Sequence, residues 1–241
     1  MTRPPLLVLA LLPAIAVPAG PGPAGQPPLF LTGRVEWPAD SGIPILGRQE
    51  DDVVTLRGAI PSARIGPASV AGAYRVLDVS RSATVGTLEV DGVRASVADG
   101  CIRAHAGSVV VRSTHCRMSG GPQAGGVNMP FGLDVTAAAA VLVEDSSFEG
   151  FRWRSAPDRY WNGDGISIEK GVAGATFRRV SANDNTDAGF DIRPHAMMSD
   201  VSAAGNCRNF RFWSGADAGT QTTGDSMKRG GISACSGIWL N

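Results

Sequence analysis

The chain has 241 residues, 43% of them hydrophobic, and its 22 basic residues balance 22 acidic ones. This length and apolar content allow one domain with a continuous core. A chain without net charge lacks the basic field that holds a nucleic-acid backbone or an anionic membrane surface, so we expect neither partner. The 31 glycines and 16 prolines, set among short Val, Ala, Ser and Thr runs, favour strands and turns over long helices.

The N-terminal residues follow the pattern of a secretory signal peptide. Arg3 precedes an apolar run over residues 6–17 that is too short to span a bilayer. We predict a signal peptide over 1–19, a flexible Pro/Gly-rich leader over 20–34 and one folded domain over 35–241. No later apolar stretch reaches the ~18 residues of a membrane helix. A periplasmic or secreted protein is therefore expected.

Apolar residues recur along the chain with the spacing of a solenoid repeat. One series has separations of 33, 24 and 22 residues and consists of Gly132-Leu133, Gly165-Ile166, Gly189-Phe190 and Phe212. A second series runs in phase with it, at separations of 32, 34 and 21 residues, and consists of Val111, Val143, Phe177 and Met198. One coil is therefore about 21 to 24 residues long. The longer separations predict inserted loops near 117–131, 150–163 and 214–226, because insertions of a solenoid vary more freely than its coils.

Each coil holds two or three short strands. Residues 165–169 alternate apolar and polar side chains, and a second strand over 175–180 follows a turn. Strands stacked coil on coil must pair in parallel. The pattern resembles the pectin-lyase type of fold, so we predict an all-β, single-stranded right-handed parallel β-helix of about seven coils. A leucine-rich repeat lacks its Leu ladder here, and a β-sandwich is the main alternative.

The four cysteines predict two disulfides in an oxidising compartment, since their spacing resembles no metal motif. We favour the local pairs Cys101–Cys116 and Cys207–Cys235, each within about one coil. Free thiols buried inside the coil are the alternative.

Strand alternation places candidate catalytic groups on the outside of the coil. If Ile166, Phe190 and Phe212 point inward, one external column contains Asp134, Ser167, Asp191 and Trp213, and the next contains Thr136, Glu169 and Arg193. Two carboxylates that are two coils apart lie about 9 to 10 Å from each other. That separation suits the acid and base of an inverting glycoside hydrolase.

An aromatic loop before the strand that carries Glu169 is the candidate substrate contact. Flat aromatic side chains stack on sugar rings, and guanidinium groups bind carboxylates. We expect sugar contacts from Arg152, Trp153, Arg154, Tyr160, Trp161, Lys170 and Trp213. The alternative is a loop packed back on the coil or on a partner.

The segment 185–191, Asn-Thr-Asp-Ala-Gly-Phe-Asp, resembles the signature of the polygalacturonase family of glycoside hydrolases, with Ala188 inserted. The resemblance implies acid/base roles for Asp187 and Asp191. The paired aspartates that the family carries one coil later are absent, as are its Gly-His-Gly and Arg-Ile-Lys motifs. A role for Asn185 and Asp187 as turn residues is the structural alternative.

Eliminative cleavage of a uronate is a second chemistry that these residues allow. Asp164, Asp187 and Asp191 could bind calcium, with Arg193, Lys170 or His195 as the base. The other two histidines, His105 and His115, are expected to be structural. The sequence thus predicts an anionic polysaccharide as partner, handled by hydrolysis or elimination, and a non-catalytic extracytoplasmic binding or structural protein is the alternative.

Overall fold

The structure is a computed structural model that describes residues 29–31, 35–36, 45–46, 51–119, 123–124, 130–154, 163–213 and 222–224. Every regular element in these ranges is a β-strand, so the prediction of an all-β fold is confirmed. Among the same residues no helix has the length and apolarity that crossing a membrane requires.

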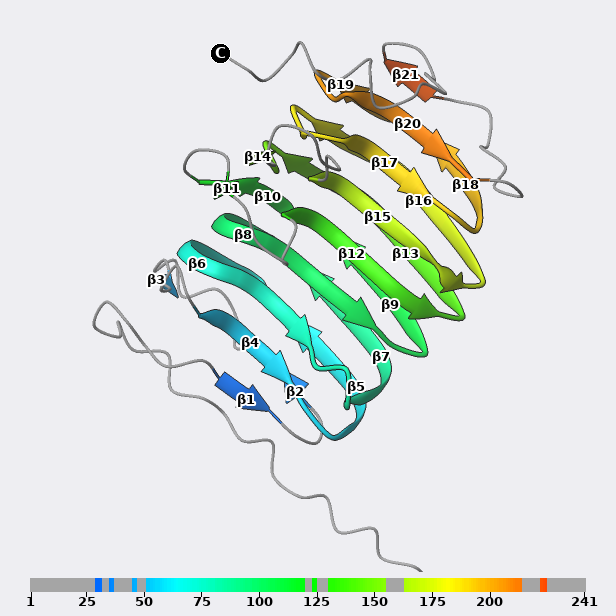
Figure 1. Ribbon diagram of the computed structural model, residues 1–241. Helices are drawn as coiled ribbons and strands as arrows, with labels where there is room; N and C mark the ends of the chain where they lie inside the picture. Colours follow the sequence, from blue (N-terminus) through cyan, green and yellow to red (C-terminus); the bar gives the residue numbers. More distant parts are fainter. Residues whose placement is uncertain are drawn as a thin grey trace, which may run out of the picture.

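The strands are short and follow one another closely along the chain (Figure 1). Their bounds are β1 (Leu29–Leu31), β2 (Val35–Glu36), β3 (Ile45–Leu46), β4 (Asp52–Leu56), β5 (Ala59–Ile65), β6 (Ala68–Val79), β7 (Thr84–Asp91), β8 (Val93–His105), β9 (Ser108–Arg112), β10 (His115–Met118), β11 (Gln123–Ala124), β12 (Phe131–Ala138), β13 (Ala140–Glu149), β14 (Trp153–Arg154), β15 (Asp164–Val172), β16 (Gly174–Asn183), β17 (Ala188–Ile192), β18 (His195–Ser199), β19 (Val201–Ala204), β20 (Arg208–Phe212) and β21 (Thr222–Gly224).

Parallel pairing arranges these strands in three columns, and the chain visits each column once before it starts the next layer (Figure 1). Column A contains β1, β4, the second halves of β6 and β8, and then β12, β15, β17 and β20. Column B contains β2, β5, β7, β9, the first halves of β13 and β16, and β18. Column C contains β3, the first halves of β6 and β8, β10, the second halves of β13 and β16, β19 and β21.

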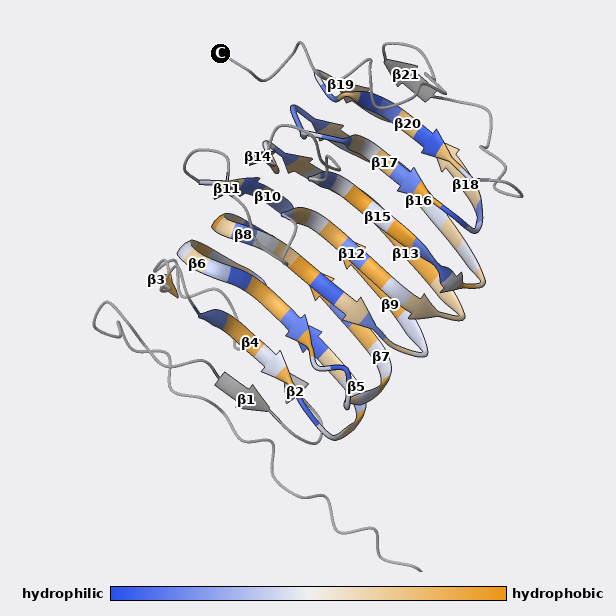
Figure 2. Ribbon diagram, in the orientation of Figure 1, coloured by the Kyte–Doolittle hydropathy of each residue, from blue (hydrophilic) through white to orange (hydrophobic). Residues whose placement is uncertain are grey.

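The core is a stack of apolar side chains in direct register. Column A contributes Val54, Leu77, Ile102, Leu133, Ile166, Phe190 and Phe210, and column B contributes Ile65, Val90, Val111, Val143, Phe177 and Met198. Phe190 joins the two sets, because its ring lies edge-on to Phe177 at 5.7 Å and stacks on Phe210 at 5.2 Å. Each such buried side chain stabilises the fold by roughly 1.5 to 3 kcal/mol. Figure 2 shows the resulting alternation of apolar and polar residues along the strands.

The register confirms the second predicted series in full and corrects the first. Leu133, Ile166 and Phe190 are in register as predicted, but the partner of Phe190 is Phe210, and Phe212 pairs with Ile192. The prediction for Phe212 was wrong because the last layer of column A is 20 residues long and not 22.

Layers approach too closely for a side chain where column A begins. A Cβ on Gly132 would lie 2.3 Å from the backbone oxygen of Gly165, and one on Gly189 would lie 2.7 Å from that of Asn209. The glycine of the Gly-led pairs is therefore required by packing between layers.

The corner between columns B and C uses one left-handed residue in each layer. Gly92, Ser113, Asp145, Arg179 and Asp200 have φ of 70°, 46°, 50°, 53° and 53°. Only glycine adopts this conformation without steric cost, and Asp and Asn tolerate it better than most residues. The turn chemistry of the sequence therefore marks a real corner.

The insertions lie where the long separations placed them, between β10 and β12 and between β13 and β15. They touch, since β11 pairs in parallel with β14. Residues 222–224, inside the predicted loop over 214–226, form β21 against β19. Residues 29–31, inside the predicted leader, form β1 against β4. The predicted signal peptide lies outside the described residues.

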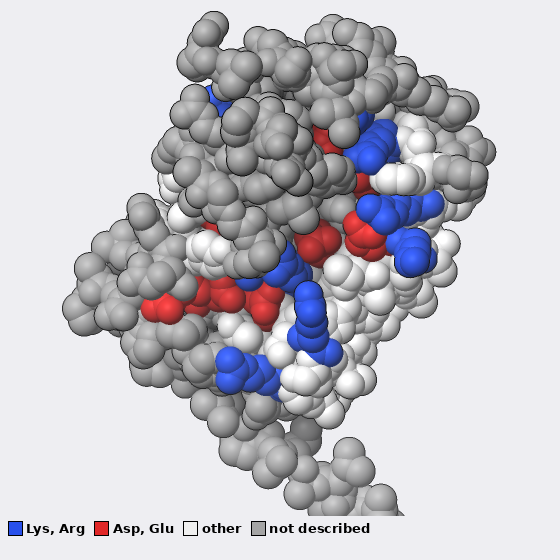
Figure 3. All heavy atoms as spheres, in the orientation of Figure 1, with Lys and Arg blue, Asp and Glu red and all other residues white. Residues whose placement is uncertain are grey.

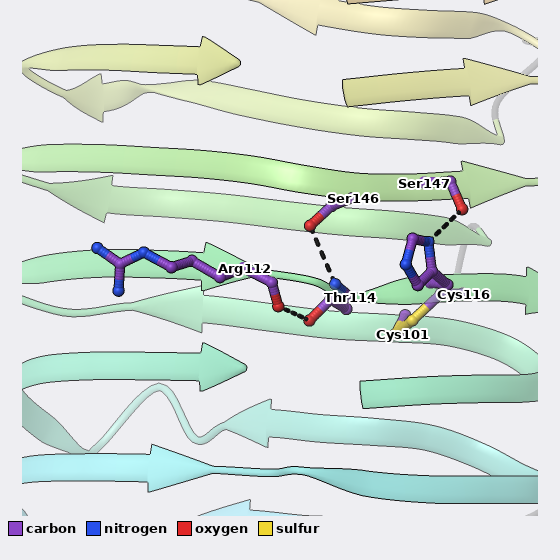
Figure 4. Close-up of a disulfide and its surroundings, with 7 residues drawn as sticks. Cys101, Arg112, Thr114, Cys116, Ser146 and Ser147 are labelled. Atoms are coloured by element: carbon purple, nitrogen blue, oxygen red, sulfur yellow. Dashed lines mark hydrogen bonds between the residues drawn. A yellow bond between two sulfur atoms is a disulfide. The ribbon is translucent and has the colours of Figure 1, made fainter. Parts of the chain in front are cut away.

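A disulfide joins Cys101 on β8 to Cys116 on β10 across the inside of the coil (Figure 4). Both residues are buried and their Cα atoms are 6.2 Å apart. This predicted pair is confirmed. Cys207 is also disulfide-bonded, and its predicted partner Cys235 lies outside the described residues.

Candidate functional site

Charged residues gather on the outward face of column A, where acidic and basic side chains lie next to one another (Figure 3). The outward residues in direct register are Thr55, Asp78, Arg103, Asp134, Ser167, Asp191 and Arg211. The predicted column of Asp134, Ser167 and Asp191 is thereby confirmed. Trp213 was wrongly placed in it, because the 20-residue layer puts Arg211 at that position.

The centre of this face is a group of three buried aspartates, Asp164, Asp187 and Asp191, which we call the acidic cluster. Arg211 joins two of them, since its Nη1 lies 3.3 Å from Oδ2 of Asp187 and 3.5 Å from Oδ2 of Asp191. These two carboxylates therefore share one guanidinium group. Arg208 Nη1 also donates a hydrogen bond to Oδ1 of Asp187.

Strand pairing brings these residues together from three layers. Asp164 opens β15, Asp191 lies within β17, and Arg208 and Arg211 belong to β20. Asp164 differs from the other two aspartates in its contacts, because its Oδ1 accepts a hydrogen bond from the backbone N–H of Ala188 at 2.9 Å and no arginine pairs with it within the described residues.

Burial controls the ionisation of the acidic cluster. It raises the pKa of Asp164 well above the usual value, and the neighbouring carboxylates of Asp187 and Asp191 raise it further. Burial also raises the pKa of Asp187 and Asp191, but there the guanidinium groups of Arg208 and Arg211 act strongly in the opposite direction. The proton of the cluster is therefore best held by Asp164, on which the opposing effect of Arg211 is the weakest of the contributions.

An arginine and tryptophan stack borders the acidic cluster. The Trp213 ring lies between two guanidinium groups, that of Arg193 at 4.6 Å and that of Arg211 at 4.4 Å, and its Nε1 donates to Oδ1 of Asp191. Arg193 Nη1 lies 3.1 Å from Glu169, which confirms that these two residues are neighbours. Trp213 is 39% exposed, so one aromatic ring of the site reaches solvent.

The segment that resembles the polygalacturonase signature divides into a structural part and a site part. Asn185 is fully buried, where its amide donates to Asn206 Oδ1 at 2.9 Å and its Oδ1 accepts from the backbone N–H of Phe151 at 3.0 Å. The turn interpretation therefore holds for Asn185. It does not hold for Asp187, whose carboxylate belongs to the acidic cluster.

Other predicted site residues lie apart from this cluster. Asp134 pairs with Arg103 at 3.3 Å, and burial raises the pKa of its carboxyl group. Thr136 falls at a register shift between β12 and β15. Lys170 is exposed near the end of β15, and His195 is exposed at the start of β18 in column B. The acidic cluster, by contrast, is buried on column A.

The two histidines expected to be structural make hydrogen bonds within the coil. His105 Nε2 lies 3.2 Å from the Ala83 oxygen. His115 Nδ1 lies 3.0 Å from Ser147 Oγ, beside the disulfide (Figure 4). These contacts agree with the structural role that we expect for them.

The aromatic loop is described only at its ends. Arg152 Nε donates to the backbone oxygen of Asp184 at 3.3 Å. Trp153 and Arg154 form β14, of which the backbone alone is described, and Tyr160 and Trp161 lie outside the described residues. Contact between this loop and a sugar stays a prediction.

A second charged group, which the sequence analysis did not detect, surrounds Arg75 on β6. Its guanidinium lies 3.0 Å from Asp99, 3.6 Å from Asp78 and 4.0 Å from Asp52, so it ties together layers β4, β6 and β8. Burial raises the pKa of Asp52 to about 6, and its buried Oδ1 has no hydrogen-bond partner. Arg75 itself is buried, which makes this group structural in character.

Arg208 and Arg211 are the site residues that sequence reasoning missed. Each lies 20 residues after its partner in register, Ala188 or Asp191, so a shorter final layer would have revealed them. Their partners are set by the stacking of layers, which residue type alone does not show.

The described residues contain no group of three or more His, Cys, Asp or Glu side chains placed to hold a metal ion. Two aspartates of the predicted calcium set, Asp187 and Asp191, have arginine as their counterion. The calcium prediction therefore gains no support from the arrangement.

Known proteins offer no direct guide to this site. No protein-family model, no curated protein and no solved structure matches the chain. The resemblance of residues 185–191 to the polygalacturonase signature stays a prediction, and the roles of the aspartates must be argued from their geometry.

Proposed function

We propose that this chain is an extracytoplasmic right-handed parallel β-helix of about seven coils that binds an anionic carbohydrate polymer on the outward face of column A and hydrolyses it at the acidic cluster. The observation that carries this proposal is the unequal pairing of three buried carboxyl groups. Asp187 and Asp191 face guanidinium groups, whereas Asp164 accepts a backbone hydrogen bond. Hydrolysis of a glycosidic bond needs such a protonated acid beside an ionised carboxylate.

In this proposal Asp164 gives its proton to the glycosidic oxygen as the bond to the leaving sugar breaks. Asp191 takes a proton from the attacking water, which adds its oxygen to the anomeric carbon. Asp187, held by Arg208 and Arg211, keeps Arg211 against Asp191 and is a positioning residue. Proton transfer of this kind contributes typically about 10² to 10⁴ in rate for each group.

The border of the cluster supports an acidic sugar as the substrate. The exposed ring of Trp213 offers a surface for stacking on a sugar. Arg193 Nε is buried without a hydrogen-bond partner, so the guanidinium retains a donor for an anion. A uronate carboxylate next to a stacked ring would satisfy both groups.

Location outside the cytoplasm is supported by two features. The N-terminal residues carry the signal-peptide pattern, and the Cys101–Cys116 disulfide is of a kind that forms and persists in oxidising compartments. The right-handed form of the coil is supported by the strong preference for right-handed connections between parallel strands.

The test is a product assay on a panel of uronate and neutral polysaccharides. New reducing ends without unsaturated sugars are the expected result, and they should come from the uronate polymers. Unsaturated ends would show elimination and overturn the acid and base roles given above. Binding without any product would overturn hydrolysis and leave the second candidate.

The second candidate is a binding protein without catalysis. It is favoured by the contacts of Asp191, whose two oxygens are taken by Trp213 and Arg211. If these contacts persist when a polymer is bound, no carboxylate oxygen of Asp191 is free to activate water. Retained affinity in Asp191→Asn together with an absence of products from the wild-type chain would establish this function.

A further inference from the structure

The outward face of column B carries two features side by side, which together we call the column B face. An apolar stripe in direct register consists of Val110, Leu142, Thr176 and Met197. Two residues along each strand, a charge ladder in direct register consists of Asp91, Arg112, Glu144 and Arg178. Neither feature takes part in the site on column A.

The apolar stripe is open to solvent at its upper end. Met197 is 55% exposed and is one of two exposed large hydrophobic residues in the described part of the chain. Val110 and Leu142 are half-buried on the same side of the sheet. Apolar side chains aligned across several outward strands mark an interaction surface more often than isolated ones do.

The charge ladder alternates in sign from layer to layer. Arg112 Nε lies 3.2 Å from Glu144, and Arg178 Nη1 lies 3.1 Å from the other oxygen of Glu144. The side chains of Arg112 and Arg178 are 39% and 52% exposed, so both guanidinium groups keep donors directed away from the sheet.

A ladder of this order is complementary to its own reverse. Read upward, the signs are negative, positive, negative, positive, and the reversed ladder has the opposite sign at every step. An anionic polymer or a nucleic acid would meet two carboxylates in this ladder and gain nothing from its alternation. A second copy turned upside down meets an opposite charge at each step.

We propose that a second copy of this chain docks on the column B face around a two-fold axis that runs parallel to the strands, between β9 and β13. Rotation about this axis keeps the position along the strand and reverses the order of the layers. Arg112 then faces Glu144 of the second copy, and Asp91 faces Arg178. The apolar stripes face each other in the same contact, which is the self-complementary interface of a symmetric dimer.

The size of this surface sets the strength of the dimer. The six layers from β5 to β18 are about 4.8 Å apart and span roughly 24 Å, which makes a contact at the small end of specific interfaces. We expect a dissociation constant on the order of 10 μM at low salt, weakened by added salt because the charges lie at the surface. The site on column A stays accessible because it lies on another side of the coil.

Sedimentation equilibrium of the full chain over a range of concentrations tests the proposal at low and at ~1 M salt. A monomer–dimer equilibrium that salt shifts toward monomer is the expected result. A chain that stays monomeric up to ~200 μM at low salt overturns the proposal.

Charge reversal identifies the face. Arg112→Glu and Glu144→Arg should each be monomeric, because each places like charges opposite one another. An equal mixture of the two variants should form a heterodimer at wild-type strength, since the introduced carboxylate of the first variant then faces the introduced guanidinium of the second. Two folded monomeric variants that do not associate in the mixture would overturn the assignment of the face.

Met197→Lys provides a variant that leaves the ladder and its internal ion pairs in place. The side chain is exposed, so the fold should be unchanged by circular dichroism and thermal unfolding. Dimerisation should weaken roughly tenfold or more. Unchanged dimerisation of this variant would also count against the column B face.

Discussion

At the residue scale, the ionisation of the acidic cluster is the property on which the proposed chemistry depends. Burial and two neighbouring carboxylates raise the pKa of Asp164, whereas Asp187 and Asp191 have arginine beside them. Hydrolysis should therefore fall at high pH as Asp164 loses its proton and at low pH as Asp191 gains one.

Asp164→Asn should abolish the alkaline limb together with activity, lowering kcat by about 10² to 10⁴. Asp145→Asn is the matched control, because Asp145 lies at the corner between columns B and C and pairs with Arg179. The pH profile of kcat on the best uronate polymer is the measurement. Equal losses in the two variants would remove the special role of Asp164.

Asp52 provides a second prediction at this scale, independent of any substrate. Its folded-state pKa of about 6 lies above the ordinary value of 3.8, so its contribution to stability is fully present below pH ~4 and is lost as the pH rises through 6. Asp52→Asn should therefore unfold at a higher temperature than the wild type at pH ~7.5, with the difference vanishing at pH ~4.

The control for Asp52→Asn is Asp78→Asn, which removes another carboxylate beside Arg75, at 3.6 Å. Thermal unfolding monitored by circular dichroism at both pH values compares the two variants. A gain in stability of equal size at the acidic and the alkaline pH would contradict the ionisation argument.

At the element scale, the contact between layers decides which positions accept a side chain. Gly132→Ala would place a Cβ 2.3 Å from the backbone oxygen of Gly165 and 2.6 Å from Phe148. We expect a loss of about 3 kcal/mol in the free energy of unfolding, since backbone must move to relieve the overlap. Gly174→Ala is the control, because its nearest neighbour lies 4.0 Å away. Urea unfolding should separate the two variants clearly.

The repeat could be predicted from sequence because its strongest signal is the register of apolar residues. Val111, Val143, Phe177 and Met198 are paired in the predicted order, since side chains at these positions are buried in every layer. The error at Phe212 arose because layers differ in length, and both Phe210 and Phe212 are apolar residues with the same strand parity.

The site was predictable only in part. Asp134 and Asp191 follow from strand alternation, and Asp187 from its motif. Arg208 and Arg211 act on a carboxylate that lies 21 and 24 residues earlier, and this pairing depends on the three-dimensional stacking of layers. The group around Arg75 was missed for the same reason.

At the scale of the whole molecule, the Cys101–Cys116 disulfide closes a loop in the middle of the stack. A bond between residues 15 apart restricts the unfolded chain and should contribute about 3 kcal/mol to stability. Replacing both cysteines with alanine should lower the free energy of unfolding by that amount in urea. An unchanged midpoint in oxidised protein would show that the bond contributes nothing to the fold.

The three columns give the molecule separate faces, and the proposals use two of them. Column A carries the acidic cluster and column B carries the self-complementary ladder, so association and catalysis should be separable. Arg112→Glu should accordingly lose the dimer and retain activity on polysaccharide within about twofold. Parallel loss of both properties would mean that the faces are coupled.

The most direct test of the central claim is to compare product release from a uronate polysaccharide by the wild-type chain, Asp164→Asn and Asp145→Asn at equal concentrations. The account predicts reducing ends from the wild type and Asp145→Asn, almost none from Asp164→Asn, and equal binding of the polymer by all three. Reducing ends from Asp164→Asn at the wild-type rate, or none from any of the three, would contradict it.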